Sequence, residues 1–296
     1  MLERNRRLSS MMLAITVVSA GTLTTSLQAQ AAEKKGAKSK PAEKAAPKGK
    51  TNPEAFALLK EGIRLSGEGK GQEAEAKFNE AIKLHPGYAR AYANRSNIHM
   101  MRKHYHRAIA DCDKALSLDD KLGMAYINRS WAELALGQVQ KALDDASKGI
   151  ELEPKMAIAY VNRSHAYNRL GKTKEALADA NKALELSPNL AVALVNRAHT
   201  YVLEGDYKKA IEDCDKAIEL SPHMARAYVN RGRALRCLGH YEKAIVDLDK
   251  AITIDSSLAS AYYNRAEAYE KLYKADMAEA KKLGFSAAEE GKDKAH

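Results

Sequence analysis

Small apolar residues recur along this chain every 34 residues, in pairs whose members lie seven residues apart. Seven residues are two turns of a helix, so each pair forms a stripe along one side. Such a stripe lets a neighbouring helix approach closely. The first members are Ala74, Ala108, Ala142, Ala176, Ala210, Ala244 and Ala278, and the second members are Ala81, Ala115, Gly149, Ala183, Ala217 and Ala251.

A third small residue precedes each pair by twelve residues and predicts an earlier helix in every repeat. Its members are Gly62, Ser96, Ser130, Ser164, Ala198, Gly232 and Ala266. Between the two helices stands a residue suited to a left-handed cap, namely Gly69, Gly137, Gly171, Gly205 or Gly239. Proline closes four units, at Pro86, Pro154, Pro188 and Pro222. The pattern predicts helix–turn–helix units beginning at Ala55, Ala89, Gly123, Ala157, Ala191, Ala225 and Ala259.

An Asn-Arg pair follows the start of most units, usually after tyrosine, as in Tyr126-Ile127-Asn128-Arg129. A period of 34 residues with these small positions resembles the tetratricopeptide repeat (TPR) family, over residues 53–285 and seven units. The resemblance implies an all-α fold, a right-handed superhelical solenoid of antiparallel helix pairs. Both ends depart from the pattern. The first unit lacks the Asn-Arg pair, and the last is expected to have a short, Lys-rich second helix over residues 275–283.

The first 31 residues have the features of a bacterial signal peptide. Arg4, Arg6 and Arg7 precede an apolar stretch, and Ala29-Gln30-Ala31 is a small-x-small cleavage pattern. A permanent membrane anchor over residues 8–27 is the alternative, although eight serines and threonines in that stretch make a poor spanning helix. We therefore expect an exported chain that is periplasmic or secreted.

The net charge of +10 is concentrated outside the repeats. Residues 1–31 carry +2, and residues 32–52, a Lys/Ala/Pro-rich linker expected to be disordered, carry +5. The remainder holds only +3. A basic, aromatic-lined face for nucleic acid is therefore not expected. Residues 286–296 are expected to form a flexible tail, and Cys112, Cys214 and Cys237 to be buried free thiols.

The arginine of each Asn-Arg pair is accompanied by an aspartate sixteen residues later, as in Arg95 and Asp111. We interpret these residues as ion pairs between packed helices. The sequence leaves open whether partners belong to one unit or to neighbours. In the first unit the charges are exchanged, Glu61 with Lys77.

The asparagine of the pair needs a separate explanation, because asparagine is a mediocre residue inside a helix. The TPR resemblance implies that this position lines the concave groove. A side-chain amide can pair with any peptide group, and first helices about 10 Å apart would meet an extended peptide at about every third residue. The predicted asparagine ladder is Asn94, Asn128, Asn162, Asn196, Asn230 and Asn264. Inheritance by duplication, with local bonding to the backbone, is the alternative.

Further groove residues are expected between the asparagines. They are Ile127, Trp131, Val161, His165, Val195 and His199. Packing between first helices is the alternative for the aliphatic members.

TPR domains of co-chaperones clamp a terminal carboxylate with cations at set positions, and those positions here lack cations. Only Arg226 and Arg233, near Asn230, could accept an acidic end.

The repeats carry no spaced nucleophile–base–acid set and no phosphate-binding glycine loop, so we expect no enzyme and no cofactor. Two histidine groups are candidate metal ligands, namely those around His104 and the pair His165 and His199, and neither has a ligand signature. The predicted function is a non-catalytic protein–protein interaction scaffold that binds an extended peptide of an unidentified protein partner. The alternative is an assembly or homo-oligomer scaffold that docks folded envelope partners on its convex face or end helices.

Overall fold

The computed structural model describes residues 52–285, and this range contains 13 helices. The segments expected to be the signal peptide, nearly all of the linker, and the tail lie outside the described residues. The helices are α3 (Pro53–Gly67), α4 (Gly71–Leu84), α5 (Ala89–Met101), α6 (Tyr105–Leu118), α7 (Gly123–Ala135), α8 (Val139–Leu152), α9 (Ala157–Arg169), α10 (Thr173–Leu186), α11 (Ala191–Glu204), α12 (Tyr207–Leu220), α13 (Ala225–Cys237), α14 (Tyr241–Ile254) and α15 (Ala259–Lys282).

The solenoid begins at a well-capped helix. The Asn52 side chain accepts a hydrogen bond from the backbone N–H of Glu54 at 3.0 Å, and Pro53 occupies the first helical position. Proline at this position costs no helical hydrogen bond, because the backbone N–H of a first helical residue has no partner within the helix. Asn52 therefore caps the first described helix.

Six antiparallel helix pairs follow one another, and each turn inside a pair needs a left-handed residue. Five turns supply it with glycine at φ between 74° and 85°. The pair α5–α6 supplies it with Lys103 at φ 60°, the one non-glycine with positive φ in residues 52–285. A side chain in this conformation costs about 1–2 kcal/mol, so the second pair holds local strain that the other pairs avoid.

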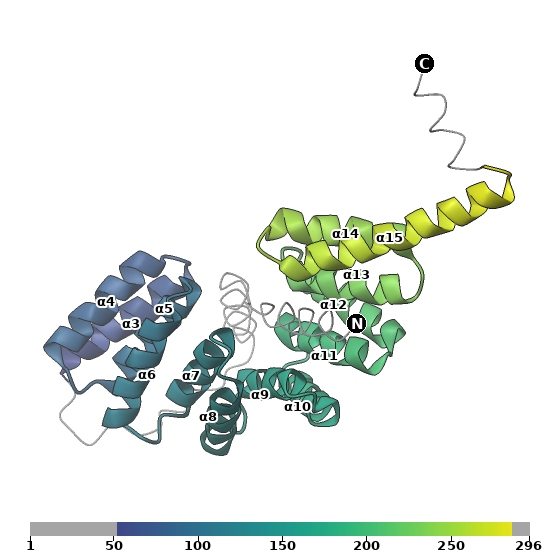
Figure 1. Ribbon diagram of the computed structural model, residues 1–296. Coiled ribbons are helices and arrows are strands. Elements are labelled where there is room, and N and C mark those ends of the chain that lie inside the picture. Colours follow the sequence, from purple (N-terminus) through teal and green to yellow (C-terminus); the bar gives the residue numbers. More distant parts are fainter. Residues whose placement is uncertain (1–51, 286–296) are drawn as a thin grey trace.

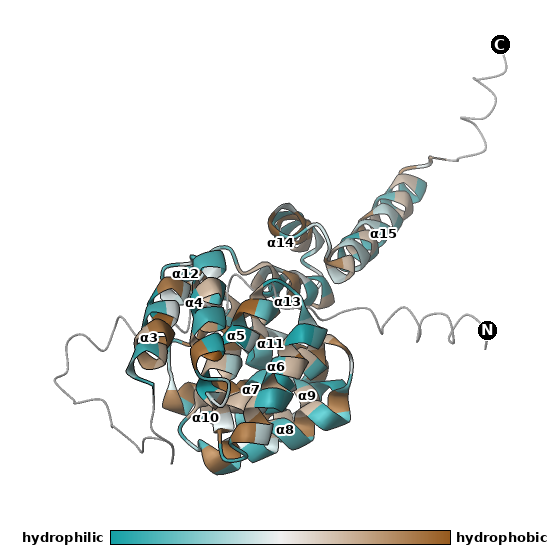
Figure 2. Ribbon diagram, turned by 90° about the vertical axis from the view of Figure 1, so that its left-hand side faces the viewer, coloured by the Kyte–Doolittle hydropathy of each residue, from teal (hydrophilic) through white to brown (hydrophobic). Residues whose placement is uncertain are grey.

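The recurring small residues are the points of closest approach between helices. A Cβ atom added to Gly62 would lie 2.5 Å from the Phe78 ring, and one added to Gly149 would lie 2.6 Å from Ile127. The paired alanines of the second helices are fully buried. The 34-residue pattern is therefore a packing requirement, repeated once per helix pair. In Figure 2 hydrophilic and hydrophobic segments alternate along the helices, as expected for helices that bury one side.

The first helices of successive pairs also contact one another, α5 with α7, α7 with α9, and so on to α15. The second helices contact mainly the first helices on either side of them. Elements that meet their equivalents in the next unit lie on the inside of the bend, so the first helices form the inner face. Figure 1 shows the resulting arc of helices.

The last unit differs from the expected one. The sequence interpretation placed a separate second helix at residues 275–283, but α15 is one helix of 24 residues. Tyr273 stands where the other units have glycine or Lys103, so no residue there favours a left-handed turn. The second half of α15 runs past α13 and α14 without a partner helix (Figure 1). It leaves Tyr269 and Tyr273 exposed.

Candidate peptide-binding groove

The asparagines of the predicted ladder make a contact that the sequence did not reveal. In four units the Nδ2 atom donates a hydrogen bond to a backbone carbonyl on the preceding first helix. The acceptors are Ala93 O at 2.9 Å for Asn128, Ile127 O at 3.0 Å for Asn162, Val161 O at 3.1 Å for Asn196 and Val195 O at 3.0 Å for Asn230. The amide donor therefore links one unit to the next.

The two terminal asparagines lack this link. Asn94 donates to Arg90 O at 2.8 Å and Asn264 to Ser260 O at 2.7 Å, each within its own helix. Asn94 belongs to the first unit that carries the Asn-Arg pair. Local bonding to the backbone, which the sequence left open, is thus found at the ends of the series and not in its middle.

The middle asparagines keep one polar atom unused. No hydrogen bond within residues 52–285 reaches Oδ1 of Asn128, Asn162 or Asn196, and none of these oxygens is fully enclosed. An amide oxygen has two lone pairs and accepts readily from a peptide N–H. The inner face thus presents a series of amide oxygens without a bond inside residues 52–285. The donors of Asn128 and Asn162 are both used within the fold, and Asn196 uses one of its two.

The other predicted groove residues fall into two groups. Ile127, Val161 and Val195 are only 3%, 4% and 6% exposed, so they pack in the core between helices and offer a ligand little surface. Trp131, His165 and His199 are half-buried. These three occupy the ninth position of successive units, on α7, α9 and α11, and form one row along the inner face.

Arg233 on α13 continues the same row, and Arg226 begins that helix. Neither arginine has a carboxylate within 4 Å among the described residues, and Nη2 of Arg226 is buried without a hydrogen-bond partner. Burial lowers the pKa of Arg226 to about 10. Burial, and then the charge of Arg233, lower the pKa of His199 to about 4. The C-terminal part of the inner face is therefore electropositive.

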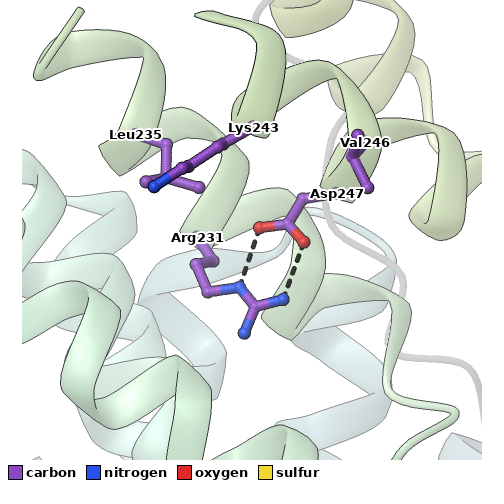
Figure 3. Close-up of a pocket in the computed structure, with 5 residues that line it drawn as sticks. All are labelled: Arg231, Leu235, Lys243, Val246 and Asp247. Carbon is purple, nitrogen blue, oxygen red and sulfur yellow. Dashed lines mark hydrogen bonds and ion pairs between the residues drawn. The ribbon is translucent and has the colours of Figure 1, made fainter. Parts of the chain in front are cut away.

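The Arg–Asp pairs are structural, and they resolve the question of partners. The Arg231 guanidinium binds both carboxylate oxygens of Asp247 in its own unit, at 2.7 Å each. Its third nitrogen, Nη1, donates to Asp215 of the preceding unit at 2.6 Å. Figure 3 shows the bidentate pair at the base of a shallow pocket lined by Leu235, Lys243 and Val246.

The same arrangement recurs at Arg95, Arg129 and Arg197. Arg163 binds only Asp179 of its own unit among the described residues, and Ser147 stands at the position of the cross-unit partner. Arg95 binds Asp111 and the preceding unit's Asn79, and Arg129 binds Asp145 and Asp113. The outer ends depart from it. Arg265 bonds only across units, to Asp249. The expected pair of Glu61 with Lys77 does not form, because each residue bonds to a neighbour three positions along its own helix.

Two further expectations concern reactive groups. Cys112 and Cys214 are buried free thiols, and burial raises the pKa of Cys112 to about 12. Cys237 is exposed, contrary to the sequence interpretation, because it ends α13 beside the turn. Within residues 52–285 no group of three His, Cys, Asp or Glu side chains could hold a metal ion, and no helix is long and apolar enough to cross a membrane.

Comparisons with known proteins agree with the architecture. Family models described as tetratricopeptide repeat match residues 89–122, 157–190 and 191–224, and one described as TPR repeat matches residues 232–272. The chain is therefore a tetratricopeptide repeat protein. Three whole units and parts of the last two are matched in this way. No curated protein matches the chain.

Solved structures show the same fold at low identity. A chain of the APC/C hetero-tetramer Cut9–Hcn1 is 18% identical with a TM-score of 0.66, over 73% of this chain and 43% of that one. A TPR protein from Parabacteroides merdae is 21% identical with a TM-score of 0.55, over 80% and 96%. TTC0263 from Thermus thermophilus is 21% identical with a TM-score of 0.53, over 62% and 99%. The chain thus spans under half the length of the Cut9–Hcn1 chain.

Proposed function

We propose that the inner face binds an extended segment of a partner protein. The fold itself is consistent with a non-catalytic scaffold for protein–protein interaction. The observation that supports peptide binding is the set of unused Oδ1 acceptors on Asn128, Asn162 and Asn196, one on each of three adjacent first helices. Adjacent helices about 10 Å apart match about three residues of an extended peptide.

The proposed recognition is one-sided. Nδ2 of Asn128 and of Asn162 donates both of its hydrogens to the preceding helix, so only Oδ1 of these residues meets the ligand, and it accepts from a peptide N–H. Asn196 donates one hydrogen to Val161 O and can use its second N–H as well as Oδ1. Peptide carbonyls face water or other side chains. Trp131, His165 and His199 lie between the acceptors and contact the side chains of the bound segment.

The test must leave the asparagines intact, since replacing them also removes contacts between units. Peptides are selected from a random library on the full chain, and their affinity is measured by calorimetry. Each backbone N–H of the best peptide is then methylated in turn. We expect losses of about tenfold or more at every third residue, because a methyl group removes the donor. A peptide that tolerates methylation throughout rules out recognition by the asparagine acceptors.

The second candidate function is docking of a folded partner, or of a second copy, on the end helices. It is favoured by the exposed aromatic side chains of α15, since Tyr263, Tyr269 and Tyr273 are each at least half exposed. Large exposed aromatic residues are common at protein interfaces. Exchange of Tyr269 and Tyr273 for serine separates the two functions. Peptide binding on the inner face is expected to be unchanged, whereas docking on α15 is expected to be lost.

A further inference from the structure

The C-terminal half of the inner face holds two arginines, Arg226 and Arg233, that form no ion pair within residues 52–285. His165, His199 and Arg233 occupy the same repeat position on α9, α11 and α13. Helix α11 contacts both α9 and α13. Arg226 lies close enough to influence both histidines. The equivalent position on α7 is Trp131 and that on α15 is Glu267. The positive charge therefore lies on the two arginines of the sixth unit, beside the imidazoles of the fourth and fifth units.

Arg226 lacks the partner that a buried charge requires. Its Nη2 atom is enclosed and makes no hydrogen bond. The groups that raise its pKa are the Tyr105 hydroxyl on α6 and then Asp255 after α14. Asp255 makes no ion pair with Arg226 within 4 Å among the described residues, and it accepts bonds from Ser257, at 3.0 Å from N and 2.6 Å from Oγ. In contrast, Arg231 on the same helix holds two aspartates. A half-buried guanidinium with an unpaired donor is a favourable partner for an anion.

We propose that Arg226 and Arg233, with the imidazoles of His165 and His199, hold a side-chain carboxylate of the bound segment. The partner segment is therefore acidic, with glutamate or aspartate placed opposite the fourth to sixth units. This inference rests on the proposed function, since it names the chemistry of the segment on the inner face. A terminal carboxylate is not required, because the cluster lies along the groove and not at one end of the solenoid.

Binding should also take up protons. The charged and polar groups that influence His165 are Arg226, His199 and Arg169, and those that influence His199 are Arg233, Arg226 and Asn230. All the charged members of this set are cations. Burial, and then these cations, lower the pKa of both imidazoles. A carboxylate between them favours the imidazolium form and raises its pKa. Affinity for an acidic segment therefore increases as the pH falls from neutrality toward the lowered pKa of the free imidazoles.

The test uses two nonapeptides, acetyl-(Ala-Glu-Ala)₃-amide and its glutamine counterpart, titrated into the full chain at low salt. Both ends are blocked, so only side-chain carboxylates can bind. We expect the glutamate peptide to bind at least tenfold more tightly. The double substitution Arg226→Gln with Arg233→Gln should remove that preference. Arg90→Gln is the matched control, because Arg90 holds the same repeat position as Arg226 but is exposed on α5. It should change affinity less than twofold.

Several results overturn this inference while leaving the proposed function intact. One is equal binding of the two peptides, and another is equal loss in the Arg90→Gln control, which indicates general charge attraction. A third is displacement by inorganic phosphate at the same concentration as by peptide, which indicates a site for a free anion. If library peptides also fail to bind the inner face, the proposed function itself fails.

In the wild type, affinity for the glutamate peptide should increase at least threefold from pH 7.5 to pH 5.5, and His199→Gln should reduce this increase. A flat pH profile contradicts the role of the imidazoles.

Discussion

Replacing Asn162 with alanine should weaken the solenoid at the contact between α7 and α9. Its Nδ2 atom donates to Ile127 O at 3.0 Å and to Ser130 Oγ at 2.9 Å, and the side chain is 5% exposed. Each bond contributes about 0.5–1.5 kcal/mol. Ile127 O keeps a second bond from Ser130 Oγ at 2.7 Å, so the carbonyl is not left bare. We expect a loss of about 1–3 kcal/mol.

Asn94→Ala is the matched control. It removes the same side chain at the same repeat position, but the lost bond lies within α5, to Arg90 O. Alanine is the better helix former by about 0.5 kcal/mol, so stability should stay nearly constant or increase.

The assay combines urea unfolding with amide hydrogen exchange, because a solenoid need not unfold in one step. Exchange in α7 and α9 should accelerate in Asn162→Ala and remain unchanged in Asn94→Ala. Equal behaviour of the two variants would refute the idea that the middle asparagines link units. In that case both Nδ2 and Oδ1 of the middle asparagines would be available to bind a ligand.

Three further predictions follow from single side chains. Burial, and then the charge of Asp145, raise the pKa of Glu133 to about 7. The folded state therefore binds a proton that the unfolded state has lost, and the free energy of unfolding falls as the pH rises from about 4.5 to 7. In urea unfolding, Glu133→Gln should raise this free energy by about 2 kcal/mol at pH 8 and leave it unchanged at pH 4. Lys103→Gly should raise the melting temperature, with a gain of about 0.5–1 kcal/mol, because it relieves a left-handed side chain; a lower melting temperature contradicts this. A maleimide should label Cys237 alone in the native protein and also Cys112 and Cys214 after unfolding, as counted by mass spectrometry; native labelling of all three contradicts the burial.

Most of the fold was predictable because packing imposes the 34-residue period directly on the sequence. The small residues must stay small where a Cβ would meet Phe78 or Ile127, and a glycine marks most turns. The last unit was predicted wrongly, because the period was extended past Tyr273. The missing glycine at that position was the available signal for one long helix.

The groove was less predictable than the fold. The row of asparagines is visible in the sequence, but the acceptor of Asn128 is a backbone carbonyl 35 residues away, and no side-chain pattern reports it. The positions of Val161 and Val195 were ambiguous, since an aliphatic residue fits a core and a groove equally well. The ion pairs of Arg231 needed coordinates, because the guanidinium reaches two units at once.

The central claim is that an extended segment binds along the inner face. Trp131 is the only tryptophan of the chain and lies half-buried in the row of groove residues. Its emission is therefore the most direct measurement, recorded while a library-selected peptide is titrated into the full chain. The account predicts a saturable change in Trp131 emission with the affinity found by calorimetry. Calorimetric binding without any change in emission would contradict it and would direct attention to α15.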